Sequence, residues 1–336
     1  MATIKDVARE AGFSVSTVSI VLRGQAKQRK IPQQTEEKIL SAARSINYQP
    51  NLSARKLRDA AGEQYTIGLF WAADVRTIVL ARVLKGLQRV LVDGGDDGYT
   101  INLVVSPYTS GRICDNKSLQ GLTNYNAAII ATADEADIRY LEENPPKIPI
   151  VFYNRNSEQF SCVATDNDAA GRTAAVHFFS KSITHIGAVL QESPFTAMLM
   201  RSNSFARMCE EHGINSLRDN TFWSDGTVSG GFEAGMRMIK RGNIPRGIFC
   251  DSDSTALGLQ NAFARNRDKI PEDMELVAIG TAPPGLTEYT TPPLTLIALP
   301  LEDMAIQAVN LLVDLLRHRV SAPRRIVLPP QLLVRE

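Results

Sequence analysis

The sequence predicts an α/β fold in three parts: an N-terminal three-helix head containing a helix-turn-helix, a hinge, and two doubly wound α/β lobes. Two observations lead to this prediction. The first is length, because 336 residues are more than one compact hydrophobic core usually holds. The second is a change in apolar spacing. Up to about residue 50 apolar residues recur with a helical period, and from Tyr65 short apolar runs alternate with amphipathic helices.

Composition is typical of a soluble globular protein, with 44% hydrophobic and 22% charged residues. No apolar run is long enough to span a membrane, and the N-terminus lacks the apolar core of a secretion signal, so we expect a cytoplasmic protein. The four cysteines, Cys114, Cys162, Cys209 and Cys250, are scattered without metal-binding spacing, and we expect reduced thiols. We expect neither a cofactor nor a metal site.

Charge is divided unevenly along the chain. Residues 1–62 carry 11 Lys or Arg against 5 Asp or Glu, whereas the remaining residues carry 26 against 31. The head is therefore basic and the body acidic. This distribution is typical of a nucleic-acid-binding module attached to a separate sensing module, although a solvated basic face alone is common.

Residues 3–23, TIKDVAREAGFSVSTVSIVLR, predict two short amphipathic helices joined by a turn. Thr3 can cap the first helix, Gly12 can end it in a left-handed conformation, and Ser14 can cap the second. The second helix begins with small and hydroxyl-bearing residues, which allow close approach to a phosphate backbone and to base edges. The pattern indicates a helix-turn-helix, and a helical hairpin of an ordinary domain is the alternative.

A third helix is predicted over residues 33–46, followed by NYQPNLSARKLR at 47–58. With these segments the sequence resembles the lactose-repressor (LacI/GalR) family of bacterial transcription regulators. The matching residues are TIKDVAREAG at the start, SVSTVS in the second helix, Thr35 and Glu36, and then Tyr48, Pro50, Asn51, Ala54, Arg55 and Leu57.

The resemblance implies a sequence-specific DNA-binding regulator, most simply a repressor. Val15, Ser16 and Ile20 would enter the major groove, and Ser14, Thr17, Ser19, Tyr48 and Asn51 would contact phosphates. Residues 52–58 would form a hinge helix on DNA and insert Leu57 into the minor groove. The full set of expected DNA-binding residues is Thr3, Ile4, Lys5, Ser14, Val15, Ser16, Thr17, Ser19, Ile20, Arg23, Thr35, Tyr48, Asn51, Ala54 and Leu57.

One DNA-facing position departs from the family pattern. Ile20 stands where many members carry an arginine that reads a guanine. Isoleucine cannot donate a hydrogen bond and offers only apolar contact, for instance to a thymine methyl. We therefore expect an operator that differs from the commonest half-site of the family.

Beyond Tyr65 the pattern predicts parallel sheets covered on both faces. The expected strands are 66–72, 99–105, 127–131, 148–154, 162–166, 185–190, 247–251 and 275–280, and the expected helices are 79–92, 135–143, 168–181, 198–213 and 253–265. A Rossmann dehydrogenase is the rival interpretation. It would need a GxGxxG directly after a strand, and no such motif, P-loop or GxSxG elbow occurs, so we expect no enzyme.

The family resemblance extends over the body of the chain, through Asp166-Asn167 with Gly171, Arg201, Asp253 with Ala256-Leu257-Gly258, PPLTLI at 292–297, and the closing RIVLPPQLLVRE. It implies a core like that of periplasmic sugar-binding proteins, with three crossovers between lobes. The expected division is a head at 1–50, a hinge at 51–62 and a core at 63–336. Lobe 1 would hold about 63–155 and 295–320, and lobe 2 about 156–294 and 321–336.

We expect a small-molecule effector, a sugar or sugar derivative, between the lobes. The expected effector-binding residues are Trp71, Asp74, Asn154, Phe195, Arg201, Trp223 and Asp253. Trp71 and Trp223 could be stacking faces, and core filling is the alternative for both. The acidic residue that several members use for sugar hydroxyls is absent, because residues 281–284 read Thr-Ala-Pro-Pro.

The expected partners are double-stranded DNA with a pseudo-palindromic operator, the effector, and a second copy of the chain. A two-fold operator requires two heads related by a two-fold axis. No leucine heptads follow the final predicted strand, so we expect a homodimer whose contacts involve helices such as 79–92 and 253–265. The alternative function is a sugar-binding protein of periplasmic type without a DNA role.

Overall fold

The computed structural model describes residues 4–22, 26, 29, 31–46, 63–73, 77–93, 99–120, 125–192, 195–214, 217–281 and 284–335. The chain divides into a head unit, residues 1–63 with 121–125, and a core unit, residues 64–120 with 126–336. The predicted hinge, residues 51–62, lies outside the described residues.

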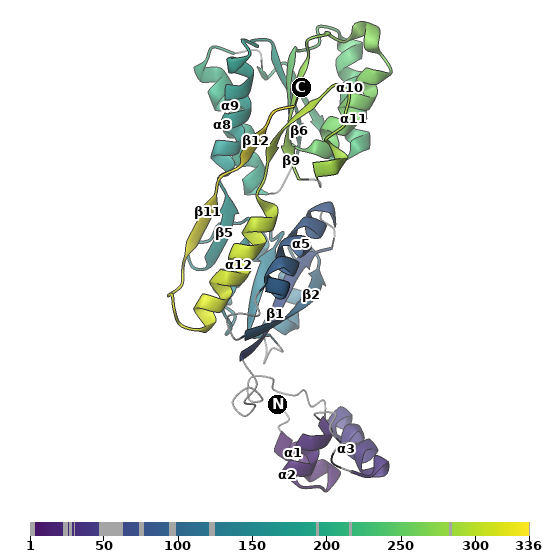
Figure 1. Ribbon diagram of the computed structural model, residues 1–336, viewed down its shortest axis with the longest axis vertical. Helices are drawn as coiled ribbons and strands as arrows, with labels where there is room; N and C mark the ends of the chain where they lie inside the picture. Colours follow the sequence, from purple (N-terminus) through teal and green to yellow (C-terminus); the bar gives the residue numbers. More distant parts are fainter. Residues whose placement is uncertain are drawn as a thin grey trace. The chain divides into compact units, whose positions relative to one another are not determined.

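The head contains the three predicted helices, α1 (Ile4–Ala11), α2 (Val15–Leu22) and α3 (Gln33–Ser45), which Figure 1 draws in purple. Val7, Val18 and Ile39, one from each helix, are fully buried and form its small core. Gly12 adopts the left-handed conformation, with φ of 73°, and the amide of Phe13 donates to the carbonyl of Ala8 at 3.1 Å. This is the C-terminal cap expected from the sequence, and it turns the chain into α2.

The core unit contains two sheets, one per lobe (Figure 1). The sheet of lobe 1 has the order β11-β5-β4-β3-β1-β2. Helices α5 and α12 pack against each other, and α12 also contacts β3, β4 and β5. The elements of lobe 1 are β1 (Glu63–Ala72), α5 (Thr77–Asp93), β2 (Tyr99–Tyr108), η2 (Ile113–Asp115), α6 (Lys117–Gln120), β3 (Ala127–Ala131), α7 (Glu135–Glu143), β4 (Ile150–Tyr153), β5 (Ser161–Thr165), α12 (Leu301–Leu316) and β11 (Arg325–Leu328).

The sheet of lobe 2 has the order β12-β10-β9-β8-β6-β7. Helices α8 and α9 form one packed pair and α10 and α11 another, and both pairs cover this sheet. The elements of lobe 2 are α8 (Asn167–Ser180), β6 (Ile186–Gln191), α9 (Thr196–Glu211), β7 (Thr221–Ser224), α10 (Val228–Arg241), β8 (Gly247–Cys250), α11 (Asp253–Ala264), η4 (Arg267–Lys269), β9 (Glu275–Gly280), η5 (Pro284–Leu286), β10 (Leu294–Ala298) and β12 (Gln331–Leu333).

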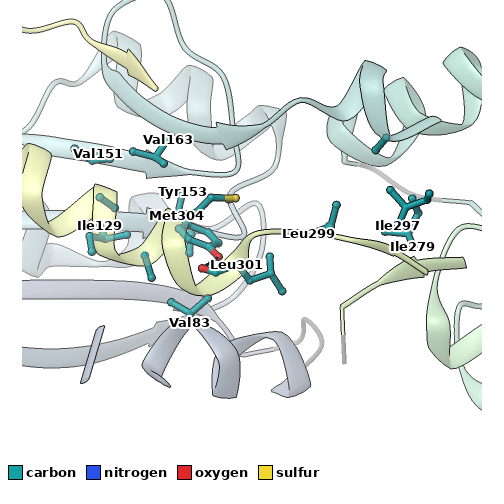
Figure 2. Packing of buried hydrophobic residues seen from close by; sticks show 14 of the residues in the cluster. Val83, Ile129, Val151, Tyr153, Val163, Ile279, Ile297, Leu299, Leu301 and Met304 are labelled. Atoms are coloured by element: carbon teal, nitrogen blue, oxygen red, sulfur yellow. Dashed lines mark hydrogen bonds between the residues drawn. The ribbon is translucent and has the colours of Figure 1, made fainter. Parts of the chain in front are cut away.

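Within the described chain the two lobes are joined by three short connections: β5 to α8, β10 to α12, and β11 to β12. In the second connection Leu299 and Leu301 are buried, and Figure 2 shows them between the lobe 1 core and Ile279 and Ile297 of lobe 2. The hydroxyl of Tyr153, at the end of β4, donates to the carbonyl of Leu301 at 2.7 Å. The start of α12 is thereby fixed to lobe 1.

The sheet topology corrects the expected lobe boundaries. Strand β5 and the later strand β11 belong to the sheet of lobe 1, where they pair in parallel, whereas the sequence predicts both segments in lobe 2. Strand β10 begins at Leu294 and pairs with β9 in lobe 2, although the segment from 295 was assigned to lobe 1. The chain therefore crosses after each of these strands and not before it. Helix α10 and strand β7 were not predicted.

Helices α10 and α11 approach each other closely because glycines stand at their contact. A Cβ on Gly258 would lie 1.9 Å from the carbonyl oxygen of Val228, and a Cβ on Gly231 would lie 2.1 Å from that of Thr255. Neither distance is sterically possible, so any larger residue would force the helices apart. Gly231 and Gly258 thus allow the close helix packing, whereas a Cβ on Gly230 would meet the side chain of Asp225 instead.

We predict that Gly258→Ala lowers the free energy of unfolding by about 1–3 kcal/mol, because the added methyl group overpacks this helix contact. Denaturant unfolding of the full chain measures the change. Gly285→Ala is the matched control, since a Cβ there would meet nothing within 4 Å. Equal stability of the two variants would contradict the steric explanation.

A partly buried carboxylate ties α8 to the sheet of lobe 2. The Oε1 atom of Glu275 lies 2.7 Å from Nε2 of His177, and Oε2 accepts from Nζ of Lys181 at 2.7 Å. The hydroxyl of Thr295 donates to Oε1 at 3.1 Å. Burial alone would raise the pKa of Glu275, but the hydrogen bonds from His177 and Lys181 outweigh it and hold the pKa at about 2.

A carboxyl whose pKa is lower in the folded than in the unfolded chain stabilises the fold above its ordinary pKa, and this stabilisation is lost as the pH falls toward the folded-state value. We therefore predict that Glu275→Gln costs on the order of 2 kcal/mol at neutral pH. The difference from the unmodified protein should shrink as the pH falls from about 4.5 to about 2. Urea titrations at several pH values measure this difference, and a pH-independent difference would rule out the ionised carboxylate as its source.

Candidate DNA-binding and effector-binding sites

The N-terminal end of α2 is organised by Ser14. The amide of Thr17 donates to Oγ of Ser14 at 3.2 Å, as expected for a helix cap. The same oxygen lies 2.8 Å from the hydroxyls of both Ser16 and Thr17. Three hydroxyl groups are therefore clustered at the helix end that carries the positive dipole, a suitable place for a phosphate oxygen.

The two sides of α2 have different environments. Val18 and Val21 are buried in the head core, and Val15 and Ser16 are exposed. Ile20 is partly exposed, although it lies between the two buried valines in sequence. Val15, Ser16 and Ile20 can thus reach a molecule outside the head without disturbing its core.

The remaining predicted DNA-binding residues fall into two groups. Among the described ones, Ile4 packs against the head core, Lys5 is exposed, and Ser19 and Thr35 are partly buried. Ile4 therefore also stabilises the head. The others, Thr3, Arg23, Tyr48, Asn51, Ala54 and Leu57, lie outside the described residues.

The core unit contains a cavity of about 710 Å³ lined by residues of both lobes. Many of its polar residues lie at the carboxyl ends of parallel strands, which is where doubly wound folds bind ligands. The lining consists of Trp71, Ala73, Ile78, Val79, Thr132, Tyr153, Asn154, Arg155, Leu299 and Leu301 from the lobe 1 side and of Gln191, Phe195, Ala197, Met198, Arg201, Asp225, Gly226, Thr227, Val228, Asp251, Ser254 and Thr281 from the lobe 2 side.

Four predicted effector-binding residues lie together in this lining: Trp71, Asn154, Phe195 and Arg201. The Arg201 side chain is buried and held in place, because its Nε donates to Oδ1 of Asn167 at 2.7 Å. Asn167 in turn donates from Nδ2 to the carbonyl of Thr165 at 3.2 Å. The first turn of α8 therefore orients a guanidinium on α9.

Two of the predicted effector-binding residues that the structure describes, Asp253 and Trp223, are not part of the lining. Asp253 is fully buried below it, where its carboxylate accepts hydrogen bonds from the amide of Thr281 at 2.7 Å and from the Thr281 hydroxyl at 3.0 Å. Trp223 is 53% exposed on the edge strand β7, outside the cavity. Asp74 lies outside the described residues. Asp253 acts on the cavity through Thr281, which does line it.

Several lining residues were not predicted from the sequence, among them Thr132, Arg155, Gln191 and Asp251. A common signal could have found them, since each lies at or just beyond the carboxyl end of a predicted strand. Arg155 is the most distinctive: burial lowers the pKa of its guanidinium to about 10, although nearby Tyr108, Glu135 and Asp134 oppose this shift. The residue stays protonated at neutral pH.

In the part of the chain that the structure describes, no group of three His, Cys, Asp or Glu side chains is arranged to hold a metal ion. In the same part, no helix is both long and apolar enough to cross a membrane.

The molecule thus combines a helix-turn-helix head with a two-lobed ligand-binding core, the architecture of an effector-controlled DNA-binding protein. Residues 3–51 match the family described as bacterial regulatory proteins, lacI family, and residues 175–336 match the periplasmic binding protein-like domain. A solved LacI-family transcription regulator from Clostridium acetobutylicum is 32% identical with a TM-score of 0.77, covering 81% of this chain and 100% of that one. The chain belongs to the LacI family of bacterial transcription regulators.

Two named relatives match the whole chain. The probable HTH-type transcriptional repressor ExuR of Bacillus subtilis (strain 168) is 26% identical over 344 residues, covering 100% of this chain and 98% of the relative. The ribose operon repressor of Escherichia coli (strain K12) is also 26% identical over 344 residues, covering 100% and 99%. The protein is accordingly a DNA-binding transcriptional regulator, and a binding protein without a DNA role is not favoured.

Proposed function

We propose that the protein binds a pseudo-palindromic operator as a homodimer and that a small effector in the interlobe cavity sets its operator affinity. The effector is a sugar or a sugar derivative. Helix α2 enters the major groove with Val15, Ser16 and Ile20, while Ser14 and Thr17 contact phosphates. Because operator DNA lies in the cytoplasm, the protein acts there.

The cavity shared by both lobes is the observation that carries this proposal. A ligand that touches two lobes has an affinity that depends on the angle between them, so its binding changes the population of lobe arrangements. Operator affinity then changes through the separation of the two heads in the dimer. The angle between the lobes thus determines both the affinity for the ligand and the response on DNA.

The lining favours a hydroxylated ligand. Arg201, Asn154 and Thr281 offer donors and acceptors for hydroxyl groups, while Trp71 and Phe195 offer apolar surface for the carbon faces of a sugar ring. The relative that carries the name of the ribose operon repressor is consistent with an effector of this class.

A binding selection on fragmented genomic DNA tests the proposal directly. The purified full-length protein should enrich fragments that share a pseudo-palindromic site, and footprinting should locate it. Addition of neutral sugars, sugar acids and sugar phosphates one at a time should identify a compound that changes operator affinity at least tenfold. Failure to enrich any shared site would contradict the proposal, and so would light scattering showing a monomer on operator DNA.

We predict that Ile20→Arg shifts the preferred half-site toward guanine at the facing position. A well-placed bidentate Arg–guanine contact is worth about 1–3 kcal/mol of discrimination, whereas isoleucine offers no hydrogen bond. Selection from a randomised half-site library measures the shift. Lys38→Arg serves as the control for added guanidinium character on the exposed head surface, because Lys38 is exposed and is not among the expected DNA-binding residues. An unchanged preference in Ile20→Arg would mean that this side chain does not face bases.

We predict that a protein lacking residues 1–60 retains the fold of the core and binds effector but not operator. The core has its own hydrophobic interior. The solved regulator from Clostridium acetobutylicum is matched over 100% of its own length, although the match covers only 81% of this chain. Thermal unfolding, effector titration and a gel-shift experiment check the three parts of this prediction. Retained operator affinity would place the DNA-binding surface outside the head.

A further inference from the structure

Two adjacent residues at the start of α9 contact lobe 1. The guanidinium carbon of Arg155 lies 4.4 Å from the ring centroid of Phe195. This is a cation–π contact between two residues that line the cavity. The hydroxyl of Thr196 donates to the Oε1 carboxylate oxygen of Glu135. Glu135 and Arg155 belong to lobe 1, whereas Phe195 and Thr196 belong to lobe 2. We call these four residues the interlobe clasp.

The lobe 1 side of the clasp is firmly placed. Arg155 donates from Nε to the carbonyl of Ala133 at 2.5 Å and from Nη1 to the carbonyl of Asn154 at 2.7 Å. Glu135 is the first residue of α7, whose cap Asp134 accepts hydrogen bonds from the amides at 136 and 137. A change in lobe angle therefore displaces Phe195 and Thr196 against fixed partners.

The chemistry of the clasp suits a contact that opens and closes. The Thr196 side chain is exposed, so water can replace Glu135 as its partner when the lobes part. The Arg155 guanidinium keeps its two carbonyl partners whether or not Phe195 covers it. Neither side leaves a buried charge without a partner on opening, so two lobe arrangements can lie close in free energy.

We propose that Phe195 and Thr196 are positioning residues that hold the two lobes at one angle, and that the effector changes operator affinity by making or breaking the interlobe clasp. This inference rests on the proposed coupling between lobe angle and DNA binding. Since Phe195 and Arg155 also line the cavity, a bound ligand is in direct reach of the clasp.

The variants for the test are Phe195→Leu, Thr196→Val and the double variant, with Thr196→Ser as the conservative change that keeps the hydroxyl. Two controls remove similar contacts inside lobe 2. Ser202→Ala removes a hydroxyl on α9 that donates to the carbonyl of Met198 at 3.3 Å. Phe232→Leu removes the ring that lies 5.0 Å from the guanidinium carbon of Arg265.

The interlobe distance is measured by pulsed electron paramagnetic resonance on the full-length protein. Cys114 in lobe 1 is exposed and takes one spin label, and Glu233→Cys on α10 takes the second. The remaining cysteines, Cys162, Cys209 and Cys250, are buried and do not compete for the label. Operator affinity is measured on the same variants without labels, with the operator that the genomic selection yields.

We expect the double variant to shift and broaden the interlobe distance distribution and to change operator affinity at least fivefold. Thr196→Val alone should give part of both effects, Thr196→Ser should behave like the unmodified protein, and the two controls should change neither the distance distribution nor operator affinity. Thr196→Val alters an exposed side chain, so it remains informative even if Phe195→Leu impairs folding.

An unchanged distance distribution in Thr196→Val and in the double variant would overturn the clasp itself. A changed distance distribution with unchanged operator affinity would overturn the regulatory role of the clasp. In that case the lobe angle and DNA binding are not coupled as proposed. The two failures are thus told apart by which measurement stays constant.

Discussion

The structure of the core depends on one constraint: in the part of the chain that the structure describes, the backbone passes between the two lobes through short segments. Each lobe has its own six-stranded sheet, and no strand among the described residues is shared between them. Leu299 and Leu301, both buried, lie where the chain crosses from the sheet of lobe 2 to helix α12 of lobe 1. The bond from Tyr153 to the carbonyl of Leu301 fixes one of these segments to lobe 1. Relative motion of the lobes is therefore a rotation about these connections, and the space between the lobes is where such a rotation has its effect.

The cavity combines side chains held by very different means. Arg201 is oriented by Asn167, which the first turn of α8 supplies, while Asp253 is buried and contacts the lining residue Thr281. Two residues that we expected to bind the effector thus have different roles, because Arg201 lines the cavity whereas Asp253 is fully buried outside its lining. Support of this kind gives a binding site a fixed geometry before a ligand arrives.

Much of the fold could be predicted from sequence, because the signals involved are local. The apolar stripes of the head, the glycine that ends α1, and the apolar runs of β3 and β9 are each contained in a few consecutive residues. The lobe assignment of β5, β10 and β11 could not be predicted in this way, since it depends on which distant strand each one meets. Helix α10 escaped prediction because Gly230, Gly231 and Gly235 weaken its helical signal, although Gly231 and Gly235 allow it to pack closely against α11. Cavity residues such as Arg155 and Gln191 become evident only when strand ends are brought together.

The last two strands have a consequence for how the protein is made. Strand β11 forms an edge of the sheet in lobe 1 and β12 an edge of the sheet in lobe 2, and they are separated only by two prolines. During synthesis the head can fold as soon as its three helices have emerged from the ribosome, since its contacts are local. Both lobes, by contrast, must wait for residues 325–333 before either sheet is finished. A nascent chain therefore carries a folded DNA-binding head while its ligand-binding core is still incomplete.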